Sequence, residues 1–157
     1  MFTTYDVERL LKKDHERMNN LFHALHDTQP AQREEKELLI YELFSVINLH
    51  FQINESVLYP EIEKRLMDYP MIEYAQGLQN EVFDLMSQIE VLSVEDPAWN
   101  GLITEMEDSI REHIKNEELE ICSRFQAGSF DDAALGRKLA DKRYELLSED
   151  KGWRKSA

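Results

Sequence analysis

The sequence predicts an all-α protein, built as an up-down antiparallel four-helix bundle with a short additional C-terminal helix. Only five Gly and four Pro occur among 157 residues, of which 42% are hydrophobic. Apolar residues recur at steps of three and four along four long segments. Short links join these segments, which favours antiparallel neighbours. The length fits one domain, so we expect residues 1–148 to form the bundle and residues 149–157 a flexible tail.

The first helix is expected to begin near Thr3 or Thr4 and to end near Asp27, before a turn at Pro30. Acidic residues in its first turns suit the positive end of the helix dipole. One face carries apolar residues together with a histidine at steps of three and four: Leu11, His15, Met18, Phe22 and Leu25. This spacing predicts that the face, histidine included, points into the core.

The second helix is expected to begin between Arg33 and Lys36. Pro60 predicts a bend or an early stop, because proline removes a backbone hydrogen bond. The helix then continues to about Asp68. Its inward face consists of Leu39, Leu43, Ile47, His50, Phe51, Asn54, Val57 and Leu58.

Pro70 opens the third helix at a first-turn position, where proline is tolerated. Its inward face carries Ala75, Leu78, Val82, Leu85, Met86 and Ile89. The segment SVEDP precedes the fourth helix, which is expected to end near residues 127–128. The inward face of that helix carries Leu102, Met106, Ile110, His113, Ile114, Glu117 and Ile121. A shorter fifth helix is expected over SFDDAALGRKLADKRYELL, capped by Ser129 or Asp131.

The charge of the chain excludes some partners. There are 32 acidic and 18 basic residues, with a net charge of -14. This balance argues against nucleic acid and disfavours an anionic membrane surface as partner. No apolar run approaches the ~20 residues of a membrane span. The single cysteine, Cys122, rules out an internal disulfide and fits the reducing cytoplasm, where we expect the protein. No protein partner is specified, and a homodimer is compatible with the sequence.

The histidines carry the functional information. Three of the five interrupt apolar faces on three separate helices: His15, His50 and His113. Residues four apart share a face of a helix, so His113 and Glu117 point the same way, as do His50 and Asn54. At ~1.5 Å per residue, His15 and His50 lie roughly 18 and 21 Å from the turn that joins their helices. We therefore expect the imidazoles to meet in one layer of the bundle.

Such a layer predicts a metal site. A single inward histidine is more often a core residue that is hydrogen-bonded to a neighbour. Three imidazoles and a carboxylate in an apolar core are costly when unpaired, and a bound cation is a common resolution in helical bundles. Imidazole and carboxylate donors suit iron, manganese or zinc.

Three segments together resemble the hemerythrin-like HHE cation-binding family: KKDHERMNNLF, LHFQINESVLYPEI and REHIKNEELEI. The resemblance covers about residues 5–145 and includes the tail segment LGRKLADKR. It implies a metal centre with His15, His50, His113 and Glu117 as ligands. It also implies non-haem iron, as one or two ions, and a small diatomic molecule as the ligand of the metal.

Two positions depart from the family pattern. The bridging carboxylate expected at position 54 is Asn54, and the histidine expected near position 82 is Val82. Glu55 is a candidate replacement ligand, but it lies about 100° around the helix and reaches inward only if Pro60 or a bulge rotates the turn. Glu81 is the carboxylate nearest to Val82. Because the departures mostly remove ligands from one iron, we expect a mononuclear or weak second-metal site rather than an intact diiron centre.

The function expected from this set is binding or sensing of O2, NO or peroxide at a non-haem metal, rather than defined enzymatic turnover. Two alternatives stay open. One is a degenerate, metal-free bundle that acts as a protein interaction module, which Asn54 and Val82 favour. The other is an enzyme that uses a single metal with peroxide. The retained histidines and Glu117 disfavour the metal-free module, because a bundle without a metal could bury less costly apolar residues there.

Overall fold

The computed structural model describes residues 6–126 and 132–149, which are helical apart from the turns that join the helices. No strand occurs in these ranges. The long helices are α1 (Val7–His26), α2 (Arg33–Ile53), α4 (Tyr69–Glu90), α5 (Trp99–Asn116) and α7 (Asp132–Glu149). The shorter elements are the π-helical turn η1 (Asn54–Leu58), α3 (Tyr59–Leu66), the π-helical turn η2 (Glu117–Ile121) and α6 (Cys122–Gln126). The predicted fold class is confirmed.

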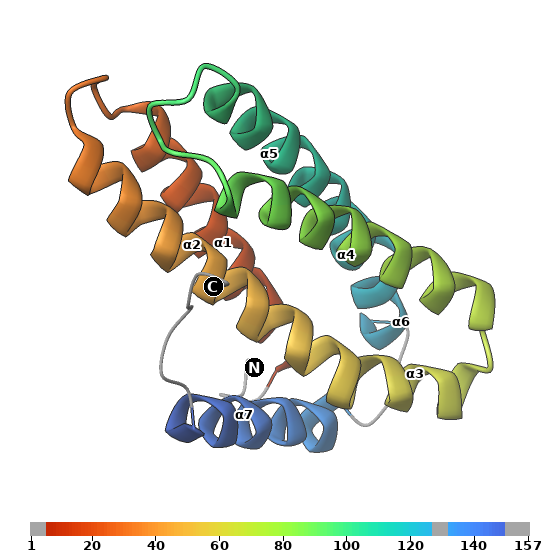
Figure 1. Ribbon diagram of the computed structural model, residues 1–157. Coiled ribbons are helices and arrows are strands. Elements are labelled where there is room, and N and C mark those ends of the chain that lie inside the picture. Colours follow the sequence, from red (N-terminus) through yellow and green to blue (C-terminus); the bar gives the residue numbers. More distant parts are fainter. Residues whose placement is uncertain (1–5, 127–131, 150–157) are drawn as a thin grey trace.

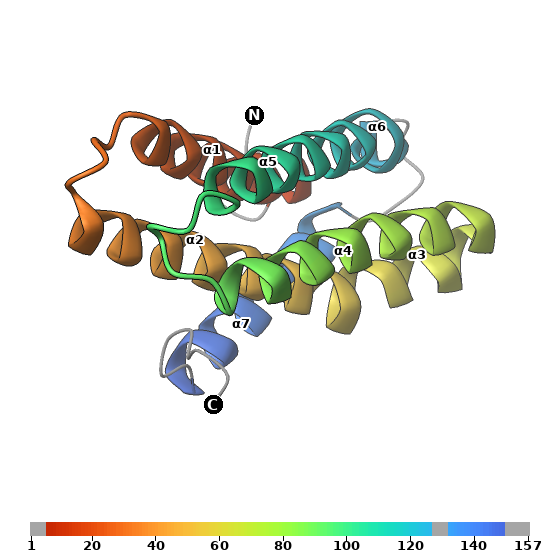
Figure 2. The same ribbon diagram turned by 45° about the horizontal axis from the view of Figure 1, so that its top comes forward.

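The bundle consists of two antiparallel pairs of helices. Helix α1 packs along α2, and α4 packs along α5 (Figures 1 and 2). Helix α2 runs on without a break through η1 into α3, and α5 runs on through η2 into α6. Helix α7 lies across the end of the bundle where α1 begins, against α1, α2 and η1. It is the predicted fifth helix.

Helix boundaries follow local caps. Asp6 caps α1, accepting a hydrogen bond at 2.9 Å from the backbone N–H of Arg9. The start predicted near residues 3–4 lies outside the described residues. Asp27 is the C-cap of α1, as predicted. Asp68 caps α4 in the same way as Asp6 caps α1, and Pro70 occupies its first turn. The predicted end of the fourth helix, the Ser129 or Asp131 cap and most of the predicted tail also lie outside the described residues.

Of the two effects predicted at Pro60, the early stop does not occur, whereas a bend does. The second helix passes through the π-helical turn η1 and changes direction as it enters α3, and Pro60 lies in the first turn of α3 (Figures 1 and 2). In η1 the N–H of Tyr59 donates to the carbonyl of Asn54, five residues back. A π turn inserts one residue into a helix, and such turns are frequent at functional sites. The helix then ends at Leu66, because Met67 adopts a left-handed conformation with φ 54°.

The core consists of two hydrophobic clusters stacked along the bundle. The first includes Met18, Ile47, Val82 and Ile110, and the second includes Leu11, Ile53, Leu58 and Ile121. Helix α7 contributes the buried Leu135 and Leu139 to the second cluster. In the part of the chain that the structure describes, no helix is long and apolar enough to cross a membrane.

Candidate metal centre

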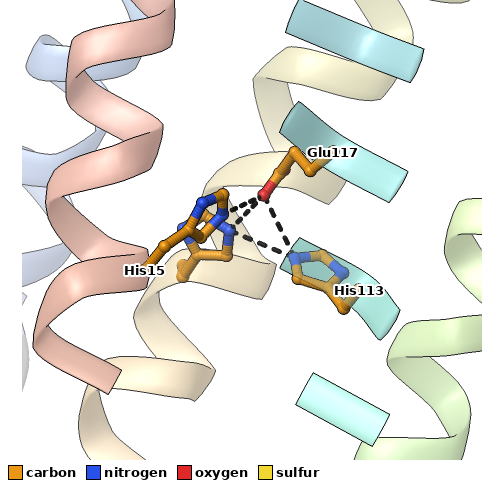
Figure 3. A group of neighbouring side chains, drawn as sticks. His15, His113 and Glu117 are labelled. Atoms are coloured by element: carbon orange, nitrogen blue, oxygen red, sulfur yellow. Dashed lines mark hydrogen bonds and ion pairs between the residues drawn. The ribbon is translucent and has the colours of Figure 1, made fainter. Parts of the chain in front are cut away.

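Four buried side chains meet at the boundary between the two hydrophobic clusters. His15 comes from α1, His50 from α2, His113 from α5, and Glu117 is the first residue of η2. Each is at most 2% exposed. Each histidine replaces an apolar residue on an inward helix face, as its spacing predicted. Figure 3 shows His15 and His113 directed toward Glu117 from separate helices.

One carboxylate oxygen is the focus of the cluster. Glu117 Oε2 lies 2.6 Å from His15 Nε2, 2.8 Å from His50 Nε2 and 3.1 Å from His113 Nε2. The Nε2 atoms of His50 and His113 are 3.3 Å apart. One donor atom from each of the four residues lies within 4.8 Å of every other, which is a spacing that a metal ion can bridge.

Two outer carboxylates orient the rings. His50 donates from Nδ1 to Asp14 Oδ2 at 2.8 Å, and His15 donates from Nδ1 to Glu118 Oε2 at 3.1 Å. The hydrogen at Nδ1 is assigned from these acceptors. A neutral ring that donates from Nδ1 presents the lone pair of Nε2. When these rings are deprotonated at Nε2, both lone pairs are thus directed to the space beside Glu117 Oε2, in the carboxylate–histidine arrangement that is common around protein-bound metals.

The centre attracts positive charge. Burial lowers the pKa of His50, but Glu117 and Asp14 outweigh it and raise that pKa to about 10. Burial raises the pKa of Glu117, yet the neighbouring His50 and His113 hold it well below its usual range. Burial lowers the pKa of His113. Without a metal, a proton on His50 lies between His50 Nε2 and Glu117 Oε2. A metal ion bound there would take the place of this proton.

Two buried polar atoms of the cluster are unpaired. Glu117 Oε1 and His113 Nδ1 have no hydrogen-bond partner among the described residues. Buried polar atoms without partners are costly and rare in native proteins. The unpaired Oε1 is a second oxygen that a cation at the centre can use.

A hydrogen-bonded network of uncharged side chains occupies the region beside Asn54. Asn54 Nδ2 donates to Gln79 Oε1 at 3.0 Å, and the Tyr59 hydroxyl donates to the same oxygen at 2.9 Å. All three of these residues are at most 1% exposed. Val82, at the position where the resemblance implied a histidine, is fully buried in the first hydrophobic cluster. Among the described residues, the carboxylate that contacts this network is that of the exposed Glu55, which accepts a hydrogen bond from Gln79 Nε2 at 3.1 Å.

The structure brings together four of the five predicted ligands, and Glu55 is not one of them. The side chain of Glu55 is exposed, and it accepts hydrogen bonds from Gln76 at 3.2 Å and Gln79 at 3.1 Å. The π turn η1 does interrupt the helix here, but it leaves Asn54 facing inward and Glu55 outward. Glu81 is exposed as well.

Three residues near the centre were missed. Asp14 directly precedes His15 in KKDHE, and about 100° of helix rotation turns it toward α2. Gln79 lies three residues before Val82, so the helical spacing placed it on the inward face. Glu118 follows Glu117, but no periodic pattern marks it as a partner of His15. Helical spacing was the signal available for Asp14 and Gln79, and no signal was available for Glu118.

Two comparisons place the chain among known proteins. The family model described as "Hemerythrin HHE cation binding domain" matches residues 6–124, a range that contains all four clustered residues. A crystal structure of a hemerythrin HHE cation binding domain-containing protein from Mycobacterium kansasii has the same fold. Its TM-score is 0.74 at 18% identity, over 92% of this chain and 91% of that one. No curated protein matches the sequence. The chain belongs to the hemerythrin HHE cation-binding domain family.

Proposed function

We propose that the chain is a non-haem iron-binding protein that holds one iron with His15, His50, His113 and Glu117 and binds O2, NO or peroxide there. Family membership and the buried cluster indicate metal binding. The observation that carries the proposal is the convergence of four buried donor atoms within 4.8 Å of one another.

The donor set fits such an ion. Three imidazole nitrogens and a carboxylate oxygen suit iron, with manganese and zinc as alternatives. Asp14 and Glu118 hold two of the rings with Nε2 facing inward, so these nitrogens need little reorientation to bind. The negative charge of Glu117 offsets part of the charge of a divalent ion in this apolar surrounding. A bound iron would supply Lewis acidity and redox chemistry.

A single ion is favoured over two. A second ion in the region beside Asn54 would meet the amides of Asn54 and Gln79, the phenol of Tyr59 and the apolar Val82. None of these groups carries the negative charge that a second buried divalent ion needs for compensation. Asn54 Nδ2, Gln79 Oε1 and the Tyr59 hydroxyl also already bond to one another, which leaves Asn54 Oδ1 as one neutral oxygen without a partner among the described residues.

The space around the centre favours a small ligand of the metal. The hydrophobic clusters lie above and below the four residues, and the ring of Phe51 lies 4.9 Å from that of His113. Four protein donors leave an octahedral shell incomplete. A molecule the size of O2 or NO is small enough for an enclosed position of this kind, and apolar walls suit an uncharged diatomic ligand.

The second candidate is the metal-free interaction module. One observation favours it: each of the three Nε2 atoms already lies within hydrogen-bonding distance of Glu117 Oε2. The cluster thereby satisfies much of its own polarity. Against this stands the burial of three imidazoles and a carboxylate, two atoms of which have no partner among the described residues.

Metal content tests the proposal. Untagged protein grown with added iron is analysed for iron, manganese and zinc, alongside His113→Ala and the matched control His26→Ala. His26 is the last residue of α1, away from the four clustered residues, and its Nε2 lies 2.8 Å from Glu107 Oε2. We expect about one iron per chain in the wild type and in the control, and loss of iron in His113→Ala. A folded wild-type protein that takes up none of the three metals would favour the interaction module.

A further inference from the structure

Helix α7 lies outside the residues that match the family model, which end at residue 124. It packs against α1, α2 and η1. Its own Leu135 and Leu139 are buried in the second hydrophobic cluster, and its Lys138 pairs with Glu61 of α3 at 2.8 Å. These contacts fix α7 across the end of the bundle that lies nearest to the first turns of α1.

One side chain of α7 reaches the surroundings of the metal centre. The guanidinium of Arg143 donates through Nη2 to Asp14 Oδ2. The same oxygen accepts the hydrogen of His50 Nδ1 at 2.8 Å. The side chains of Arg143 and Asp14 are 29% and 12% exposed, so the contact is largely shielded from water. A continuous chain of hydrogen bonds therefore runs from α7 through α1 to the imidazole of His50.

Asp14 has room to adopt other positions. A surface cavity of about 330 Å³ adjoins it and is lined by Lys13, Arg17 and Arg143, among others. Arg17 is already bound to Glu42 at 2.5 Å. Without Arg143, the carboxylate could turn from His50 toward water or toward Lys13. Besides His50 itself, Arg143 is the cation that pairs with Asp14 among the described residues.

We propose that Arg143 is a positioning residue of the metal centre: it holds Asp14 on Nδ1 of His50 and so keeps the Nε2 atom of His50 directed at Glu117. The C-terminal helix α7 thereby sets the affinity of the centre for its metal. The bound metal in this inference rests on the proposed function. The hydrogen-bonded path from Arg143 through Asp14 to His50 rests on the structure. Groups that orient a ligating histidine through its second nitrogen commonly change metal affinity by about 10–100-fold.

A purely structural role of α7 is the competing explanation, and Lys138 provides the matched control. Both Arg143 and Lys138 are cations of α7 that pair with a partly buried carboxylate of the bundle. The side chains of Asp14 and Glu61 are 12% and 14% exposed. Only Arg143 reaches a residue that touches a ligand. Arg143→Met and Lys138→Met both keep an apolar stem that can pack, and Arg143→Lys restores the charge without the guanidinium.

The test compares full-length wild type with these three variants. Co(II) affinity is measured by competition with a chelator, the visible absorption of bound Co(II) reports the ligand field, and the melting temperature of the metal-free protein reports folding. We expect Arg143→Met to weaken Co(II) binding by about 10–100-fold and to alter the absorption. Lys138→Met should stay within about threefold of wild type, as its ion pair is more exposed. Arg143→Lys should fall between, because a point charge replaces a planar donor.

Two results would overturn the inference. One is an equal effect of Arg143→Met and Lys138→Met on Co(II) affinity and absorption, with both lowering the melting temperature. The other comes from NMR of the metal-free proteins labelled with ¹⁵N-histidine. In these spectra the Nδ1–H resonance of His50 reports its hydrogen bond to Asp14. An unchanged resonance in Arg143→Met would exclude a positioning role, whereas its loss would support one. If wild type bound no Co(II), the proposed function would fail, and this resonance would still decide the role of Arg143.

Discussion

Replacing Glu117 by Gln removes the only negative charge among the four clustered residues while keeping the shape of the side chain. Glu117 is fully buried, and its Oε2 lies between 2.6 and 3.1 Å from three imidazole nitrogens. A cation bound by those nitrogens would lie within about 4 Å of the carboxylate charge. At that distance, two unit charges attract each other by about 4 kcal/mol at an effective dielectric constant of about 20.

The amide oxygen of Gln remains a neutral donor, so part of the coordination survives. We expect metal affinity to fall by at least about three orders of magnitude, because each 1.4 kcal/mol corresponds to roughly a factor of ten. The assay is chelator competition with Co(II) or Zn(II), with Glu120→Gln as control. Glu120 lies in the same π turn, carries the same charge and is exposed. Affinity of Glu117→Gln within tenfold of wild type would refute Glu117 as the anionic ligand.

Three further predictions follow from the surroundings of the centre. Gln79→Leu leaves Asn54 Nδ2 and the Tyr59 hydroxyl without their acceptor. It should therefore lower the free energy of unfolding by about 2–4 kcal/mol, as measured by urea denaturation. Metal affinity should change little. Metal uptake near pH 7 should release about one proton per chain, because the ion displaces the proton of His50, whose pKa is raised to about 10. Affinity should therefore fall as the pH falls, and titration calorimetry in buffers of different ionisation enthalpy counts the protons; equal heats in all buffers would contradict this. Zn(II) at a hundred times its dissociation constant should stabilise the wild type by about 2.7 kcal/mol, raising the melting temperature by roughly 5–11 °C, and should leave His113→Ala unchanged.

The helices and the four clustered residues could be predicted because both follow from the same helical spacing of three to four residues. His15, His50 and His113 stand where an apolar residue would continue the inward face, so the pattern that defines each helix also gives their direction. Asn54 and Val82 were located by the same spacing, and both are buried. The sequence was sufficient to predict that these residues point inward, because the direction of each depends only on the spacing within its own helix.

Contacts between distant segments could not be predicted in this way. Arg143 and Asp14 are 129 residues apart, and neither lies on a face whose spacing specifies the other. The π turns η1 and η2 depend on which backbone carbonyl each N–H meets, a choice that packing makes. Glu55 illustrates the consequence. A π turn did form beside it, but Asn54 stayed on the inward face that the helical spacing predicted, and Glu55 remained exposed.

The central claim is a single iron held by three imidazoles and one carboxylate, and X-ray absorption at the iron edge of the iron-loaded protein tests it most directly. We expect a shell of nitrogen and oxygen donors with the outer scattering of imidazole rings, at about one iron per chain, and no scattering from a second iron. An iron–iron distance of about 3.5–4 Å, as in two-metal centres, would contradict it, as would a first shell without imidazole.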